Sequence, residues 1–170
     1  MLIAPRSKCH LKFVPFALVL LGLFPLPTFA KASYPALIEG KVVGVHDGDT
    51  ITLLQAKKQY KVRLDGIDAP ELSQAYGQVS KRFASEFAFG KIARVEVHGV
   101  DRYGRYLGEV FVNGQSLNKA ILAAGLAWHY KQYSKDPLLA SLEAEARLKR
   151  FGLWKDSSPI PPWEYRKRKK

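Results

Sequence analysis

The first strands of this chain can be recognised in residues 36–54, which have the sequence ALIEGKVVGVHDGDTITLL. Apolar and mostly β-branched residues lie on both sides of His46–Asp49, a segment whose Asp and Gly residues are typical of turns. We therefore expect a strand, a tight turn and a second strand. Residues 60–64 continue as a third strand, in which Val62 faces one side and Arg63 the other, because strand side chains alternate.

Beyond residue 70 the pattern of apolar residues predicts one helix, two strands and two further helices. In chain order we expect them at 73–90, 91–98, 106–112, 116–125 and 136–151. Asp136 followed by Pro137 is typical of a helix start, because Asp caps the first turn and Pro fits its first position. Five strands and three helices in this order favour a small α+β domain built on a closed or nearly closed five-stranded β-barrel.

The composition excludes several classes of protein. The chain has 170 residues, a formal charge of +12 and one cysteine. A hydrophobic content of 47% is enough for a core, and the length favours one domain. One cysteine cannot form an internal disulfide or a thiolate zinc site. The strong positive charge favours a polyanionic partner such as nucleic acid or an acidic membrane surface.

Residues 1–30 have the organisation of a secretory signal peptide. Three basic residues precede an uncharged, mostly apolar stretch at 13–30, which ends in small residues suited to a signal peptidase. Cleavage is expected after Ala30, although a cut after Ala32 fits nearly as well. An uncleaved membrane anchor is the alternative, but three prolines in the stretch disfavour a continuous helix. We expect an exported protein, either secreted or periplasmic.

The C-terminal residues 157–170 differ in composition from the rest of the chain. A Pro-rich segment leads into Arg166-Lys167-Arg168-Lys169-Lys170. We expect a disordered basic tail that makes, at most, a weak contact with an anionic surface. The domain itself is expected to span residues 31–156.

Four carboxylates are expected at strand ends or in loops, namely Asp47, Asp49, Asp68 and Glu71. Carboxylates from separate loops, together with a backbone carbonyl and water, form the oxygen-rich kind of site that hard divalent cations prefer. Structural explanations stay open for each residue. Asp47-Gly48-Asp49 also suits a hairpin turn, and Glu71 also suits the start of a helix.

Two arginines are candidates as well, and each also has a structural explanation. Arg63 on an alternating strand can be a solvated surface residue, and Arg105 can simply close a hairpin. The histidines of the chain are scattered singly, without the spacing of a metal site, so we do not expect a histidine-based mechanism. None of these residues indicates a function by itself.

Three segments taken together are more specific: GVHDGDT at 44–50, VRLDGIDAPE at 62–71 and DRYGR at 101–105. In order and spacing they closely resemble the three signature segments of the staphylococcal nuclease (thermonuclease) family. With further similar features near residues 125 and 152, the resemblance covers residues 37–155. The fold that it implies is an OB-type five-stranded barrel with three helices, which agrees with the expected order of elements.

The resemblance implies a Ca2+ site beside a catalytic base. Asp49 and Asp68 would bind Ca2+ together with the backbone carbonyl of Ala69. Glu71 would orient or deprotonate the attacking water, and a carboxylate near water and metal is a suitable proton acceptor. No cysteine, histidine or organic cofactor is needed.

The resemblance also implies contacts to the substrate. Arg63 and Arg105 would bind the scissile phosphate, and their rigid guanidinium groups suit the negative charge that develops there during hydrolysis. Arg102 and Tyr103 would help to place a neighbouring phosphate. Tyr133 is the best candidate for a contact to a base.

The function implied is an exported, Ca2+-dependent, sugar-nonspecific nuclease, acting as a monomer on DNA and RNA and leaving 3′-phosphates. The alternative is a noncatalytic OB-fold module that only binds nucleic acid. Such a module has no need of three carboxylates, which would weaken phosphate binding unless a cation neutralised them. Residues 71–76 form a much shorter segment than the mobile, lysine-containing loop of the family's type member, so the approach of the substrate is expected to differ.

Overall fold

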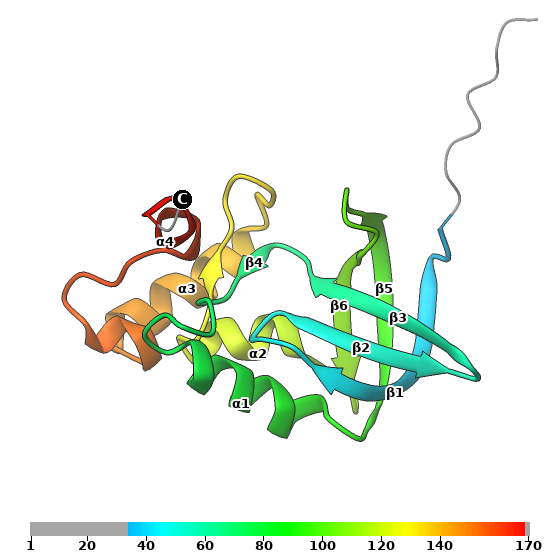
Figure 1. Cartoon of the computed structure of the whole chain (residues 1–170). Coiled ribbons are helices and arrows are strands. Elements are labelled where there is room, and N and C mark those ends of the chain that lie inside the picture. The colour runs from blue at the N-terminus through cyan, green and yellow to red at the C-terminus, as the bar shows by residue number, and fades with distance from the viewer. Residues whose placement is uncertain (1–33, 169–170) are drawn as a thin grey trace, which may run out of the picture. The chain divides into compact units, whose positions relative to one another are not determined.

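The computed structural model describes residues 34–168 (Figure 1). The predicted signal peptide therefore lies outside the described residues. Among those described, no helix is both long enough and apolar enough to span a membrane. The elements, in chain order, are β1 (Leu37–Val45), β2 (Thr50–Gln55), β3 (Lys58–Leu64), β4 (Ile67–Asp68), α1 (Gly77–Ala88), β5 (Ile92–Val100), β6 (Tyr106–Val112), β7 (Gln115–Ser116), α2 (Leu117–Ala123), β8 (Trp128–His129), α3 (Pro137–Leu148), a 3-10 helix (Gly152–Lys155) and α4 (Pro162–Arg168).

Five of the strands form a barrel. Antiparallel pairing gives the order β3-β2-β1-β5-β6, and a parallel pairing of β3 with β6 closes the sheet on itself. Gly108 of β6 pairs with Leu64 of β3 on one side and with Val97 of β5 on the other. A Cβ atom at Gly108 would lie 2.4 Å from the carbonyl oxygen of Glu96, so only glycine fits this approach. The predicted α+β, OB-type barrel is confirmed.

The interior of the barrel contains the residues that the strand pattern predicted. Val62 and Leu64 are fully buried, whereas Arg63 between them is only partly buried and faces away from the core. Short β4 continues from β3 and pairs with β8, which carries Trp128 and His129. This second pairing places the end of β4 between the barrel and the helices, which gather beside the barrel in Figure 1.

Helix α1 packs on the core largely through the face that was expected. Of the predicted core residues, Tyr76, Phe83 and Phe87 pack against the core, whereas Val79 is exposed. Ser80, Ala84 and Ala88 are fully buried beside them, where the helix lies so close to the barrel that small side chains fit best. The Ser80 hydroxyl donates to the backbone oxygen of Leu126 at 2.9 Å, which ties α1 to the segment after α2.

The predicted start of α3 is confirmed in detail. The Asp136 side chain accepts a hydrogen bond from the backbone N–H of Leu138 at 2.7 Å, and Pro137 occupies the first turn. At α2, the Ser116 side chain accepts from the backbone N–H of Lys119 in the same manner.

The C-terminal segment requires a correction. We expected residues 157–170 to be disordered, but Pro162–Arg168 form helix α4, with Pro162 buried. Trp163 of this helix packs against Trp128 and Tyr130, which are distant in sequence. The helix count among the described residues therefore exceeds the three α-helices that were predicted. The segment's proline and charge content suggested disorder, whereas its two aromatic residues were the local signal for packing.

Candidate active site

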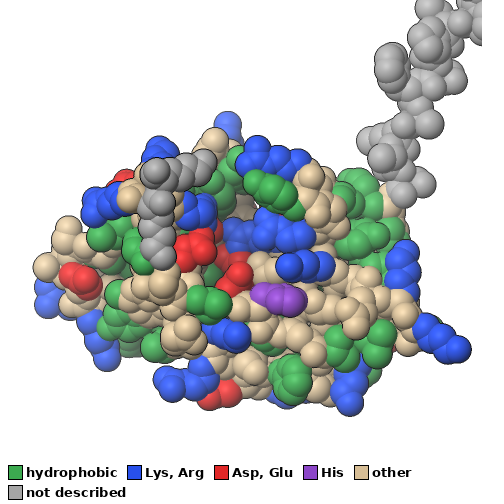
Figure 2. Space-filling model, viewed as in Figure 1, with side chains coloured by type: hydrophobic (Ala, Val, Ile, Leu, Met, Phe, Trp, Pro, Cys, Tyr) green, Lys and Arg blue, Asp and Glu red, His purple; other side chains and the backbone are tan. Residues whose placement is uncertain are grey.

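A pocket of about 600 Å³ opens where β3, β4, the hairpin between β5 and β6, and α4 come together. Figure 2 shows acidic and basic side chains meeting in a hollow on this face. Most of the residues singled out from the sequence line it: Asp49, Arg63, Asp68, Ala69, Glu71, Arg102, Arg105 and Tyr133. The structure thus brings together segments that are far apart in the chain.

Asp49 is fixed at the floor of the pocket by the turn before β2. Its side chain is almost completely buried and accepts hydrogen bonds from the backbone N–H of Ala69 at 2.6 Å and from the Thr50 hydroxyl at 3.1 Å. Its own backbone N–H donates to the side chain of Asp47, which is the local bonding expected of an Asp-Gly-Asp turn. Asp47-Gly48-Asp49 therefore forms a hairpin turn and also places Asp49 in the pocket. The structural and the functional interpretations of this segment do not exclude each other.

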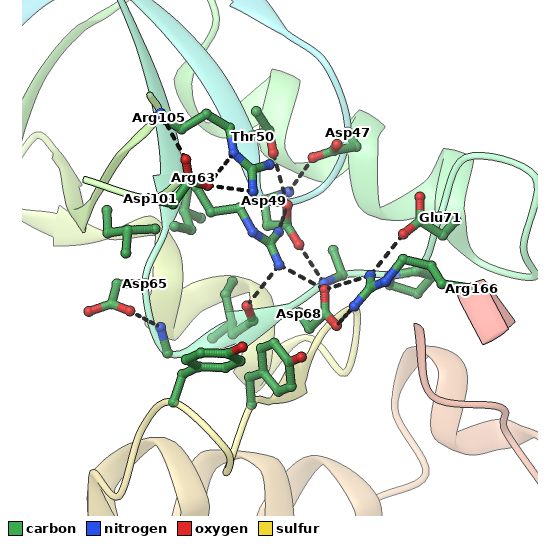
Figure 3. Close-up of a pocket in the computed structure, with 18 of the residues that line it drawn as sticks. Asp47, Asp49, Thr50, Arg63, Asp65, Asp68, Glu71, Asp101, Arg105 and Arg166 are labelled. Atoms are coloured by element: carbon green, nitrogen blue, oxygen red, sulfur yellow. Dashed lines mark hydrogen bonds and ion pairs between the residues drawn. The ribbon is translucent and has the colours of Figure 1, made fainter. Parts of the chain in front are cut away.

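Asp68 lies at the end of β4 and is the most deeply buried carboxylate of the pocket, with 1% of its surface exposed. Arg63 connects it to Asp49: one guanidinium nitrogen donates to Asp68 at 2.7 Å, and the other forms an ion pair with Asp49 (Figure 3). Two buried carboxylates are costly unless each is paired, so Arg63 stabilises both at once.

The donors present fit a hard divalent cation. Asp49 and Asp68 supply carboxylate oxygens at the pocket floor, and Ala69, whose backbone N–H donates to Asp49, lines the same pocket and has a main-chain carbonyl to offer. Hard cations such as Ca2+ accept mixed sets of this kind and complete their coordination with water. Residues 34–168 contain no cluster of three or more His, Cys, Asp or Glu side chains arranged to hold a metal ion. A cation here would depend on two carboxylates, one carbonyl and water. It would share the Asp68 carboxylate with Arg63 and with Arg166 of α4, which donate to its two oxygens and leave part of their lone-pair capacity free.

Arg105 is held at the pocket by Asp101, at the other end of the same hairpin. Its Nε and Nη2 atoms both lie 2.7 Å from Asp101 Oδ2, while Asp101 Oδ1 accepts from the backbone N–H groups of Tyr103 and Arg105. Burial raises the pKa of the Asp101 carboxyl, but the hydrogen bonds from Arg105 and Tyr103 outweigh it and hold this pKa below its usual range. Asp101 therefore stays ionised at neutral pH and orients the guanidinium.

The three predicted substrate-binding residues differ in position. Arg102 and Tyr133 line the pocket, and Tyr133 is largely exposed at 69%. Tyr103 does not line it. Its ring lies 4.9 Å from the Arg102 guanidinium, which also donates to its hydroxyl at 2.7 Å. Tyr103 thus packs against a pocket residue and is itself exposed to solvent.

Arg166 of α4 is a pocket residue that was not predicted from the sequence. Its guanidinium contacts both oxygens of Asp68, at 3.2 and 2.8 Å, and Glu71 Oε1 at 2.8 Å. Burial lowers the pKa of Arg166, but its hydrogen bonds to Asp68 and Glu71 raise it more, so this pKa lies above its usual range. Arg166 was not predicted as a site residue because residues 157–170 were expected to be disordered.

The barrel and its pocket define a class of protein, namely an OB-type barrel whose rim combines arginines with buried carboxylates. Comparison with known proteins identifies the family within this class. A sequence profile of the family described as staphylococcal nuclease homologue matches residues 61–156, more than half of the chain. The chain therefore belongs to the staphylococcal nuclease family.

Individual relatives agree with this assignment. An uncharacterized endonuclease of Escherichia coli O157:H7 is 45% identical over 141 residues, which cover 81% of this chain and 92% of that protein. An uncharacterized endonuclease of Haemophilus influenzae is 44% identical, over 76% of this chain and 74% of that protein. The staphylococcal-like nuclease CAN1 of Arabidopsis thaliana is 44% identical over 66% of this chain, although the match covers only 35% of the plant protein.

Proposed function

We propose that this protein is an exported, Ca2+-dependent nuclease that hydrolyses phosphodiester bonds of DNA and RNA. The observation that carries the proposal is the grouping of Arg63, Arg105 and Glu71 with the two buried carboxylates around one pocket. Membership of the family and relatives named endonuclease or staphylococcal-like nuclease support nuclease activity.

Each pocket residue has a distinct task in this proposal. Hydrolysis adds the oxygen of a water molecule to phosphorus and breaks one P–O ester bond. The leaving ester oxygen takes up a proton to become a hydroxyl group, and the water gives up a proton. Glu71, which is partly exposed at the pocket, accepts that proton or orients the water. Arg63 and Arg105 donate hydrogen bonds to the phosphate oxygens, on which negative charge develops. A Ca2+ ion bound at Asp49, Asp68 and the Ala69 carbonyl would supply further positive charge at the same phosphate.

The noncatalytic alternative explains less of the pocket. A protein that only binds nucleic acid gains affinity from positive charge, and carboxylates beside the phosphates reduce it. Here Asp49 and Asp68 are buried at the floor of the pocket, and Glu71 lies at its edge. Such residues are explained by a cation and a base, whereas simple binding does not require them.

The main test is a digestion assay in which the purified protein acts on plasmid DNA, single-stranded DNA and RNA. The metal condition is varied between Ca2+, Mg2+ and a chelator. We expect cleavage of DNA and of RNA with Ca2+ and no cleavage with the chelator, because the cation neutralises the carboxylates and stabilises the developing charge. Circular dichroism shows whether the protein is folded in each condition. A folded protein that leaves both single-stranded DNA and RNA intact with Ca2+ would contradict the proposal.

Export can be tested separately by expressing the full chain in a bacterial host and measuring the mass of the product outside the cytoplasm. We expect the loss of residues 1–30 or 1–32, because small residues precede both positions. A full-length product that remains with the membrane would instead support the uncleaved anchor.

A further inference from the structure

Helix α4 is anchored by aromatic packing. Trp163 stacks on Tyr130, with ring centres 5.3 Å apart and planes inclined by 2°, and meets Trp128 edge-on at 5.6 Å. Pro162 before it is buried, so the start of the helix is fixed as well. These contacts involve no charged group. The helix is therefore held beside the pocket by contacts that do not involve its basic residues, in addition to any that do.

The same segment also holds the loop that carries Glu71. The Tyr165 hydroxyl lies 3.0 Å from the backbone oxygen of Ser73 and 3.2 Å from its side-chain oxygen. The side-chain amide of Gln74 donates to the backbone oxygen of Ile160. Within the loop, the Glu71 backbone N–H donates to the Gln74 side chain at 3.2 Å. The backbone around Glu71 thus rests on the residues that lead into α4 and on α4 itself.

Arg166 extends this support to the Glu71 side chain. One of its guanidinium nitrogens lies 2.8 Å from Glu71 Oε1, and the other lies 2.8 Å from Asp68 Oδ2 (Figure 3). Within residues 34–168, Arg166 is the hydrogen-bonding partner of the Glu71 carboxylate. The planar guanidinium therefore fixes the separation of two carboxylates that would otherwise repel each other.

We propose that Arg166 is a positioning residue for Glu71, so that α4 belongs to the active site and is not a tail appended to it. This inference rests on the proposed role of Glu71 as the base. The Glu71 side chain is 40% exposed and lies in a loop, where an unpaired carboxylate would occupy several rotamers. A base works only when it is held in the productive geometry, and a displacement of about 1 Å can reduce a rate on the order of 100-fold.

The test compares Arg166→Ala and Arg166→Lys with the wild type, using a single-stranded DNA oligonucleotide and saturating Ca2+. We expect Arg166→Ala to lower kcat by roughly 10- to 100-fold with little change in KM, because it acts through the base. We expect Arg166→Lys to have a kcat between those of Arg166→Ala and the wild type. Lysine keeps the positive charge but lacks the planar guanidinium group, whose two nitrogens contact two carboxylates. Lys167→Ala is the matched control: it removes one charge from an exposed position of the same helix, and its rate stays at the wild-type level.

A double-mutant cycle with Glu71→Gln makes the test specific. Because Arg166 acts through Glu71, adding Arg166→Ala to Glu71→Gln should cause no further loss of kcat. Additive losses would overturn the proposal, as would an unchanged or increased kcat, or an effect on KM alone. A crystal structure of the Arg166→Ala protein should show Glu71 in a different rotamer. Tyr165→Phe, which keeps the packing and removes the hydroxyl, provides a second variant with a smaller expected loss.

The outcome can be separated from that of the proposed function. If the wild type and Lys167→Ala cleave the oligonucleotide, the proposed function stands whatever the result for Arg166. If the wild type does not cleave the oligonucleotide, the proposed nuclease function is contradicted, whatever the role of Arg166. The mutual geometry of Arg166 and Glu71 can then still be tested by crystallography.

Discussion

Glu71→Gln is expected to lower kcat for DNA hydrolysis by about 100- to 10,000-fold, which is the usual contribution of a positioned general base. Glutamine has nearly the same shape and keeps an oxygen that can accept a hydrogen bond from Arg166. It cannot take a proton from water at neutral pH. Because the Glu71 side chain is 40% exposed, the fold should be little affected. Steady-state kinetics with saturating Ca2+, together with thermal unfolding, measure both effects.

Glu164→Gln is the matched control for this experiment. It makes the same chemical change at an exposed position of α4, and we expect wild-type kinetics. The Glu71→Gln protein should still bind a nuclease-resistant oligonucleotide, since the arginines and the carboxylates proposed to bind Ca2+ remain. Activity within a few-fold of the wild type would refute the role of Glu71 as the base.

Much of the fold could be predicted because its signals are local. The Asp-Gly turn before β2, the alternation of Val62 and Arg63, and the cap at Asp136 each depend on residues within four positions of one another. Hydrogen bonds between near neighbours and the periodic spacing of apolar residues can be inferred directly from a single sequence. The pocket residues from the barrel were found for a different reason, since their motifs resemble those of a known family.

The contribution of α4 could not be predicted in the same way. Arg166 meets Asp68 across 98 positions of sequence, and Trp163 meets Tyr130 only after the chain has folded. Proline and basic residues locally favour disorder, and the tertiary packing of two aromatic side chains overrides that preference. The wrong prediction for Val79, which is exposed, has a similar cause. The spacing of apolar residues does not reveal how closely α1 approaches the barrel, because that distance depends on tertiary packing.

The second large effect is expected at Arg63, which we propose serves both stability and catalysis. Arg63→Ala removes the guanidinium that pairs with Asp49 and Asp68, leaving Asp49, which is 3% exposed, without its ion pair. Breaking a buried ion pair on one side typically costs about 3–5 kcal/mol, so unfolding in chelator should occur at a clearly lower temperature. In the proposed site Ca2+ would bind the same carboxylates in the folded state, and it should therefore raise the melting temperature more in the variant than in the wild type.

The catalytic effect of Arg63→Ala should remain when Ca2+ has restored stability. Loss of one donor to the developing charge costs roughly 100- to 1,000-fold in kcat, and a cation at the carboxylates cannot replace a hydrogen bond to the phosphate oxygens. Recovery of both stability and rate with Ca2+ would mean that Arg63 is only a counter-ion. Arg94→Ala is the control, because its ion pair with Glu96 is exposed and should contribute within about 1 kcal/mol. The contrast between the two arginines separates a buried pair at the pocket from an ordinary surface pair on the same barrel.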